Sequence, residues 1–159
     1  MPRVTRAEPC DSALMHGLPP PPADAVDCVT STVWLAKGIV YFQMCVKGRW
    51  ELEDSERAMA AIRRVSSDTR VPVIIGAGLF TSASTDARRF WGRADVAEGI
   101  SAMAVVVSSP VASMIVNLFM RLVPMAFPAR IFSSLVDAER WVESATSSSN
   151  SMPQAPLSP

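Results

Sequence analysis

GISAMAVVVSSPVASMIVNLFM, residues 99–120, is a run of 22 residues without a charged side chain, and its interpretation decides the fold class. A membrane-spanning helix needs about 20 mostly apolar residues, so the run is long enough to form one. Its centre, however, is Ser108, Ser109 and Pro110, where a helix facing lipid tolerates polar groups least. The pattern therefore favours two shorter elements, with membrane contact at most peripheral.

The two halves of the run have the chemistry of a buried strand and of a capped helix. Three consecutive valines end the first half, and such β-branched runs are typical of strands buried on both faces. Ser109 is a residue type that caps helices, and Pro110 suits the first helical position because its missing N–H is not needed there. We therefore predict a strand over Ala102–Val107 and a helix over Val111–Val123.

The same alternation of strand and helix signals continues on both sides of this run. Working outward, we predict strands over Ser31–Lys37, Ile39–Val46, Val71–Ile75 and Ala129–Phe132, a loop over Leu79–Ala83, and helices over Leu52–Ser66, over Thr85–Gly99 and from Ser134 onward. The resulting order is β-β-α-β-α-β-α-β-α. After an opening hairpin, each strand–helix–strand step favours parallel pairing through a right-handed crossover. The predicted fold is a single α/β domain with a mixed, mostly parallel sheet of about five strands.

Two stretches of biased composition flank this domain. Residues 1–26 contain four consecutive prolines and little periodic apolar content, which is typical of polyproline II or disorder. Residues 146–159 are rich in Ser and Pro and are also predicted to be disordered. We therefore predict a Pro-rich tail over 1–26, the α/β domain over 27–145 and a Ser/Pro-rich tail over 146–159.

The composition disfavours several classes of partner and compartment. Lys+Arg and Asp+Glu both number 15, so the chain has no global field that would attract nucleic acid. The three cysteines have no metal-type or redox-type spacing, which suits a reducing compartment. No apolar segment follows the arginines near the N-terminus, so we expect no secretory signal there. The expectation is a cytoplasmic protein that binds no nucleic acid.

The chain offers little for catalysis. Its only histidine, His16, lies in the predicted N-terminal tail, so no Ser–His or Cys–His arrangement is expected in the domain. Gly76 and Gly78 follow a strand, but no third glycine or lysine comes at the spacing of a phosphate-binding loop. Metal-ligand spacing is also missing. We therefore predict no catalytic residue, no cofactor and no metal, and we expect that the protein is not an enzyme.

Two groups of hydroxyl side chains stand at predicted helix starts. Ser82, Ser84 and Thr85 precede one helix, where the simplest role is capping and the functional alternative is phosphorylation or docking. Ser108 and Ser109 stand at the carboxyl end of a predicted strand, where open α/β sheets bind ligands. Capping is again the simplest role, and contact with an anion or ligand is the alternative.

The end of the uncharged run is more apolar than a surface helix requires. The connection after the predicted helix, VPMAF over residues 123–127, contains no polar residue. Core packing accounts for much of the apolar content, and methionine suits adaptable contact surfaces. We therefore predict an apolar interface that includes Met120, Val123, Met125 and Phe127.

Several segments together resemble a known superfamily. They are Leu52-Glu53-Asp54, Ile62-Arg63-Arg64, Val71–Ile75, Ala87–Phe90, Ala104–Pro110, Asn117–Phe119, Pro128–Phe132 and Asp137–Trp141. Over residues 30–144 the chain resembles the STAS-type fold of the anti-sigma-factor-antagonist superfamily, and more narrowly small bacterial STAS-like proteins of uncharacterised function. The group usually has an acidic residue after the strand that corresponds to Val71–Ile75, and here Gly76 takes its place.

The resemblance implies a regulatory domain. In regulatory STAS domains a partner kinase phosphorylates a Ser or Thr at the start of a helix, but the Asp-Ser pair typical of those members is missing here. We therefore expect a non-enzymatic regulatory or scaffold domain that acts through contact with a protein partner, which could be a second copy of the chain. The alternative is a carrier or sensor of an apolar or lipid-like small molecule, which the Met-rich helix also suits.

Overall fold

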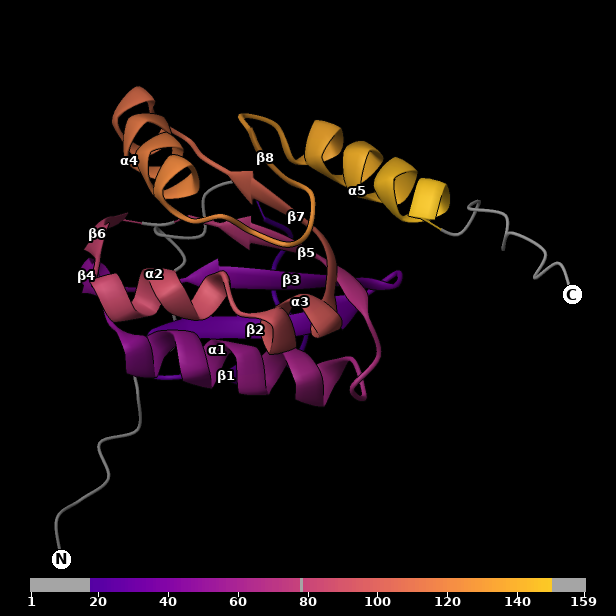
Figure 1. The fold of residues 1–159 in the computed structure, drawn as a ribbon. Coiled ribbons are helices and arrows are strands. Elements are labelled where there is room, and N and C mark those ends of the chain that lie inside the picture. The colour runs from indigo at the N-terminus through magenta and orange to yellow at the C-terminus, as the bar shows by residue number, and fades with distance from the viewer. Residues whose placement is uncertain (1–17, 78, 150–159) are drawn as a thin grey trace, which may run out of the picture.

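A mixed sheet forms the centre of the computed structural model, which describes residues 18–77 and 79–149 (Figure 1). Within these residues, six strands pair in the order β1-β2-β3-β5-β7-β8. Their bounds are β1 Val26–Asp27, β2 Ser31–Ala36, β3 Ile39–Met44, β5 Val71–Gly76, β7 Ile100–Val106 and β8 Ala129–Phe132. β1, β2 and β3 pair antiparallel, whereas β3, β5, β7 and β8 pair parallel. The predicted α/β class with a mixed, mostly parallel sheet is confirmed.

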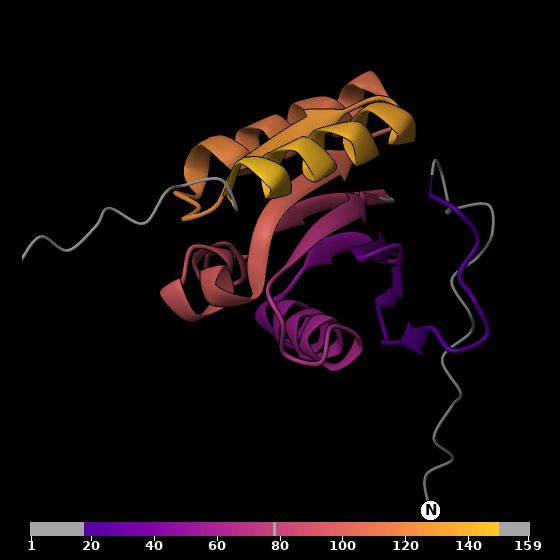
Figure 2. The same ribbon diagram turned by 90° about the vertical axis from the view of Figure 1, so that its right-hand side faces the viewer.

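Helices cover both faces of this sheet. On one face the core includes residues of α1 (Leu52–Val65), α2 (Thr85–Trp91), α3 (Ala94–Gly99) and α4 (Pro110–Leu122). On the other face a smaller core includes residues of α5 (Leu135–Ser149). Figure 2 shows α1 and α5 on opposite sides of the strands. Because both faces are covered, the inner strands are mostly apolar on both faces and do not alternate regularly with polar residues.

The uncharged run forms the predicted strand, turn and helix. Residues 100–106 are β7, fully within the sheet, and residues 110–122 are α4. Pro110 is the first residue of α4, as its fixed φ and missing N–H favour. Over residues 18–77 and 79–149, no helix is both long enough and apolar enough to cross a membrane. The prediction of a buried strand followed by a capped helix is therefore confirmed, but the helix itself is not buried, because only Val116 of α4 is fully enclosed.

The stretch Leu79–Ala83, which we predicted to be a loop, is a strand. It forms β6 and pairs parallel with β4 (Lys47–Trp50) in a second, two-stranded sheet. The Cα partners at its end are Trp50 and Ala83, so this small sheet brings the end of β4 to the start of α2. Neither segment has a clear alternating pattern, and the two segments are far apart in the chain. Each is a strand because it pairs with the other.

The single helix predicted over Thr85–Gly99 is divided into α2 and α3. Gly92 ends α2, and its N–H bonds to the carbonyl of Arg89 at 3.1 Å. Arg93 then has extended backbone geometry and pairs with Asp95 at 2.8 Å. A glycine inside a helical pattern lowers helix stability, and here it coincides with the helix end.

The predicted boundaries of the two tails also need correction. Residues 146–149, assigned above to the C-terminal tail, continue α5. At the other end, Leu18 is buried and packs in the core beneath α5, and Val26 already belongs to β1. The remaining predicted tail residues, 1–17 with His16 and 150–159, lie outside the described residues.

A hydrogen bond joins α5 to the centre of the sheet, and its loss should be measurable. The Tyr41 hydroxyl on β3 donates to the Glu139 carboxylate at 2.6 Å. Because a bond to a charged acceptor is stronger than a neutral one, Tyr41→Phe is expected to lower the free energy of unfolding by about 1–2 kcal/mol. Urea unfolding of both proteins at neutral pH measures this difference.

The same pair should make stability fall at alkaline pH. Burial, together with the neighbouring Glu139, raises the pKa of Tyr41 above its ordinary value. The folded protein therefore keeps the Tyr41 proton at a pH where the unfolded chain releases it, so stability is complete below about pH 10 and falls above it. Tyr41→Phe should flatten this decline between about pH 9 and 11. Parallel declines in the two proteins would show that Tyr41 does not cause it.

Candidate functional site

Ser109 begins α4 as a helix cap. Its hydroxyl accepts a hydrogen bond from the backbone N–H of Ala112 at 3.1 Å, which satisfies one of the free donors at the helix start. Ser108 and Ser109 are both exposed at the carboxyl end of β7. Contact of these two residues with an anion or ligand stays a prediction.

Ser84 caps α2 in the same way. Its hydroxyl accepts from the N–H of Ala87 at 3.2 Å, and the residue is only 8% exposed. Ser84 is therefore a buried cap and a poor acceptor for a phosphoryl group. Ser82 and Thr85 are exposed, and the Thr85 hydroxyl accepts a hydrogen bond from Arg88 at 3.1 Å. Phosphorylation or docking at these two residues stays a prediction.

The predicted apolar interface is wrong in part. Val123 and Phe127 are each 5% exposed and belong to the core beneath α1–α4, so neither can form an interface. Met120 and Met125 are half-buried and pack against the same core. The apolar connection after α4 is thus explained by packing, because its side chains turn inward and close that end of the core.

The exposed apolar surface lies instead on the outer side of α4. Four large side chains are exposed there: Val111 by 63%, Met114 by 67%, Leu118 by 60% and Leu122 by 54%. Their spacing of three, four and four residues places them in one row along the helix. We call this row the α4 stripe. Sequence reasoning missed it, although the spacing itself was the available signal.

Arginines border the α4 stripe. Arg121 lines a hollow together with Met114 and Leu118, and Arg88 lines a second one together with Leu118 and Leu122. A third hollow, at the C-terminal end of α4, contains Arg88 and Arg89 beside Leu122. Among the described residues, no acidic side chain lines any of these three hollows, although Asp86 pairs with Arg89 at 3.9 Å. Arg88, Arg89 and Arg121 are called the arginine rim below.

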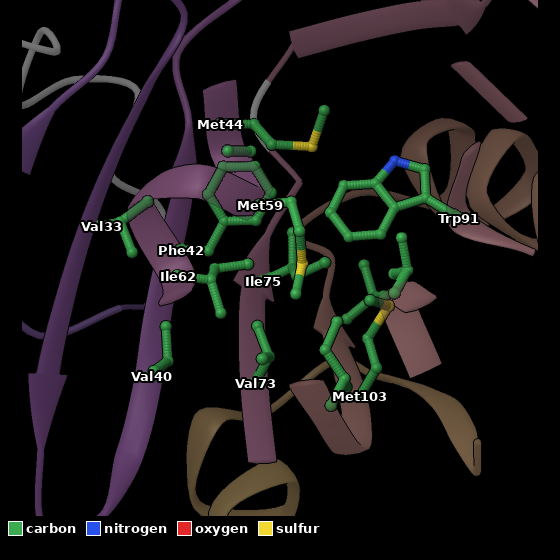
Figure 3. Close-up of a cluster of buried hydrophobic side chains, with 14 of the residues drawn as sticks. Val33, Val40, Phe42, Met44, Met59, Ile62, Val73, Ile75, Trp91 and Met103 are labelled. Carbon is green, nitrogen blue, oxygen red and sulfur yellow. The ribbon is translucent and has the colours of Figure 1, made fainter. Parts of the chain in front are cut away.

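An apolar cavity of about 50 Å³ lies beneath α4. Strands β3, β5 and β7 supply part of its wall from their carboxyl ends, and the other residues come from β4, β6, α2, α4 and the connection after α4. Figure 3 shows Phe42, Met44 and Ile75 on one side of Trp91 and Met103 below it. The lining residues are Phe42, Met44, Trp50, Ile75, Ala77, Ala83, Trp91, Met103, Val105, Val116, Phe119, Met120 and Met125.

Ser55, on α1, orients two of the cavity's aromatic walls. Its hydroxyl accepts a hydrogen bond from Trp50 Nε1 at 2.8 Å and another from Trp91 Nε1 at 3.1 Å. Ser55 is completely buried, so both indole donors are satisfied inside the protein. The indoles therefore direct their N–H groups to Ser55 and leave the cavity wall apolar. Nothing in the sequence marks Ser55 for this role.

Gly76 ends β5 at a crowded position. A Cβ there would overlap the side-chain amide of Gln43 and approach Leu18 Cδ1 to 3.0 Å. Gln43 is fully buried and donates through Nε2 to the carbonyls of Met44 at 3.0 Å and Gly76 at 3.3 Å. The close approach of the Gln43 amide therefore favours glycine at this position. The acidic residue usual in the resembling group would have to displace the side chains of Gln43 and Leu18.

The carboxylates at the start of α1 serve the helix. The Glu51 side chain accepts from the N–H of Asp54, and Asp54 accepts from the N–H of Glu51 at 2.8 Å, which is a reciprocal capping box. Asp54 also accepts from the Thr30 hydroxyl at 2.8 Å. In the described part of the chain, no group of three His, Cys, Asp or Glu residues is placed to hold a metal ion.

Comparison with protein families places the chain. The family described as a domain of unknown function, DUF7793, matches residues 33–146, which cover the sheet from β2 onward and all five helices almost to the end of α5. The chain belongs to this family. No curated protein matches it.

One solved structure is similar to this DUF7793 member in its arrangement of elements. It is the crystal structure of an uncharacterised protein of the DUF3478 family from Shewanella loihica, described as having a SpoIIAA-like fold. The two chains are 13% identical, with a TM-score of 0.47, and the match covers 70% of this chain and 91% of the other. Neither comparison names an activity.

Proposed function

We propose that this protein is a non-enzymatic regulatory domain that binds a helix of a protein partner through the α4 stripe. The observation that carries the proposal is the row of four exposed apolar side chains at helix-packing spacing. Isolated apolar residues are common on protein surfaces, whereas a continuous row is typical of an interaction site. Support for a non-catalytic role comes from Ser84, Ser109 and Asp54, whose polar groups serve as helix caps.

The shape of the stripe favours a partner helix. A single row with three- and four-residue steps is the narrow seam along which two helices pack. A helix that lies on a membrane needs a broader apolar face. Asn117, on the same helix, is exposed and bonds back to the Ser113 carbonyl at 2.9 Å, so polar groups border the seam within α4 itself.

The arginine rim favours an acidic partner. With arginines around the stripe, glutamates or aspartates beside the apolar face of the incoming helix would be attracted, and lysines would be repelled. Two copies of this chain packed stripe to stripe with their α4 helices parallel would bring one rim against the other, which disfavours that form of homodimer. The partner class is therefore an amphipathic helix with acidic flanks.

Binding of two designed peptides should test this proposal. Each is an amphipathic helix of about 18 residues with a leucine seam, flanked by Glu in one peptide and by Lys in the other. The Glu-flanked peptide is expected to bind at least about tenfold more tightly, because like charges oppose the Lys-flanked one. Leu118→Asp should reduce binding of the Glu-flanked peptide by about 30-fold or more, since it places a charge in the seam. Isothermal titration calorimetry measures both affinities.

Val136→Asp is the matched control. Val136 lies on α5 and is 61% exposed, nearly the same fraction as Leu118, so the substitution introduces the same charge at a similarly exposed apolar residue away from the stripe. Equal weakening by both variants would contradict docking on α4. If the wild-type protein is a dimer and Leu118→Asp converts it to a monomer, the partner is a second copy of the chain. If the protein binds anionic vesicles and not the peptide, the partner is a membrane.

A further inference from the structure

We propose that the cavity beneath α4 is a binding site for a small apolar molecule, such as a single aromatic ring or a short hydrocarbon. This site lies inside the domain, beneath the helix whose outer side carries the α4 stripe, and it goes beyond the docking function. All its lining residues are apolar or aromatic, and no charged side chain is among them. The class of ligand follows from this lining.

The cavity has no hydrogen-bonding groups to offer a ligand. The two lining residues whose side chains carry a nitrogen or oxygen atom, Trp50 and Trp91, both donate their indole N–H to Ser55. Water is disfavoured in such a space because it needs two or more polar partners. A ligand with a hydroxyl or charged group would lose its own hydration without compensation. The site therefore selects for molecules without polar groups.

Methionines give this site its adaptability. A cavity of about 150 Å³ takes up benzene, so a rigid space of about 50 Å³ would be too small. Four lining residues, however, are Met44, Met103, Met120 and Met125, and their unbranched chains can change rotamer at little cost. Met120 and Met125 are only half-buried, so they also mark the route from the surface. Rotation of these side chains both admits and accommodates one ring.

The position of the cavity fits a ligand site of this fold class. Met44, Ala77 and Val105 bring it to the carboxyl ends of β3, β5 and β7, where open α/β sheets bind their ligands. Its cover is α4, of which only Val116 is fully buried. A cover with so little buried surface can shift at low cost when the cavity is filled.

Benzene is the probe for this site, and the methionine methyl groups are the readout. Titration followed by methyl NMR should shift the signals of Met44, Met103, Met120 and Met125. The signals of buried Met59 and exposed Met114, which do not line the cavity, should remain in place. Phenol should bind at least about tenfold more weakly than benzene, because its hydroxyl finds no partner in the cavity.

Two substitutions on the same helix separate cavity binding from surface binding. Val116→Phe fills the cavity and should weaken benzene binding at least about tenfold, whereas Val111→Phe on the exposed side of α4 should leave it unchanged. If Val116→Phe does not fold, Ala83→Leu fills the same space from β6. No shift at the four lining methionines up to the solubility of benzene, or equal affinity in the filled variant, would overturn the proposal.

Discussion

Ser55→Ala is expected to lower the free energy of unfolding by about 2–4 kcal/mol, although it removes a single oxygen atom. The hydroxyl accepts hydrogen bonds from the indole N–H groups of both Trp50 and Trp91, at 2.8 and 3.1 Å. Removing it leaves two buried donors without a partner, and each such donor costs about 1–3 kcal/mol. The intrinsic helix preference of alanine offsets only a small part of this loss.

Urea unfolding followed by tryptophan fluorescence measures the effect of Ser55→Ala directly, because the affected residues are themselves the reporters. Ser144→Ala is the matched control: Ser144 also lies within a helix, but it is exposed and donates to a backbone carbonyl at 2.8 Å. The control should change stability by less than about 0.5 kcal/mol. If Ser55→Ala is as mild as the control, the two tryptophans do not depend on this hydroxyl.

Gly76→Asp is expected to destabilise the fold by about 3–5 kcal/mol, because it introduces an uncompensated charge at a buried position. The new side chain would overlap the Gln43 amide and Leu18, as its Cβ alone already does. The substitution restores the acidic residue usual in the resembling STAS-like group. Its cost would explain in physical terms why this chain has glycine at that point.

Gly76→Ala separates the two causes of that loss. Alanine adds the crowding without the charge and should cost about 1–3 kcal/mol, so the aspartate variant should be clearly less stable than the alanine variant. Thermal and urea unfolding of the three proteins gives the comparison. An aspartate variant as stable as wild type would mean that Gln43 yields readily and that the glycine has another cause.

Local chemistry predicted the elements whose signals lie within a few residues. Ser109 and Pro110 marked the start of α4, and Ser84 caps α2 as its position suggested. The valine run formed the strand that its β-branched side chains favour. In each case the residues that carry the signal also make the deciding contact, so the sequence alone was sufficient.

Structure that depends on distant partners could not be predicted in this way. β4 and β6 have no clear pattern of their own, and each is a strand because the other pairs with it. Ser55 gives no signal either, because Trp91 reaches it from a position 36 residues away. The cavity likewise exists only where residues of five strands, α2 and α4 meet.

The candidate interface shows the same limit. An apolar interface was predicted at Met120, Val123, Met125 and Phe127, but Val123 and Phe127 are buried in the core. α4 is apolar on more than one side, so periodicity could not say which side would face the core. Phe119 and Met120 face the cavity, and Leu118 and Leu122 face outward, because α4 packs against β6 and β8 at one side only.

The proposed docking surface is tested most directly by a double variant, Arg88→Glu/Arg121→Glu, and its affinity for the Glu-flanked and Lys-flanked peptides. In Arg88→Glu/Arg121→Glu the apolar stripe is intact and only the charge of its rim changes. We predict that binding of the Glu-flanked peptide weakens by about tenfold or more while binding of the Lys-flanked peptide strengthens, with both effects reduced in high salt. Unchanged affinity of the variant for both peptides would contradict an acidic helix on α4.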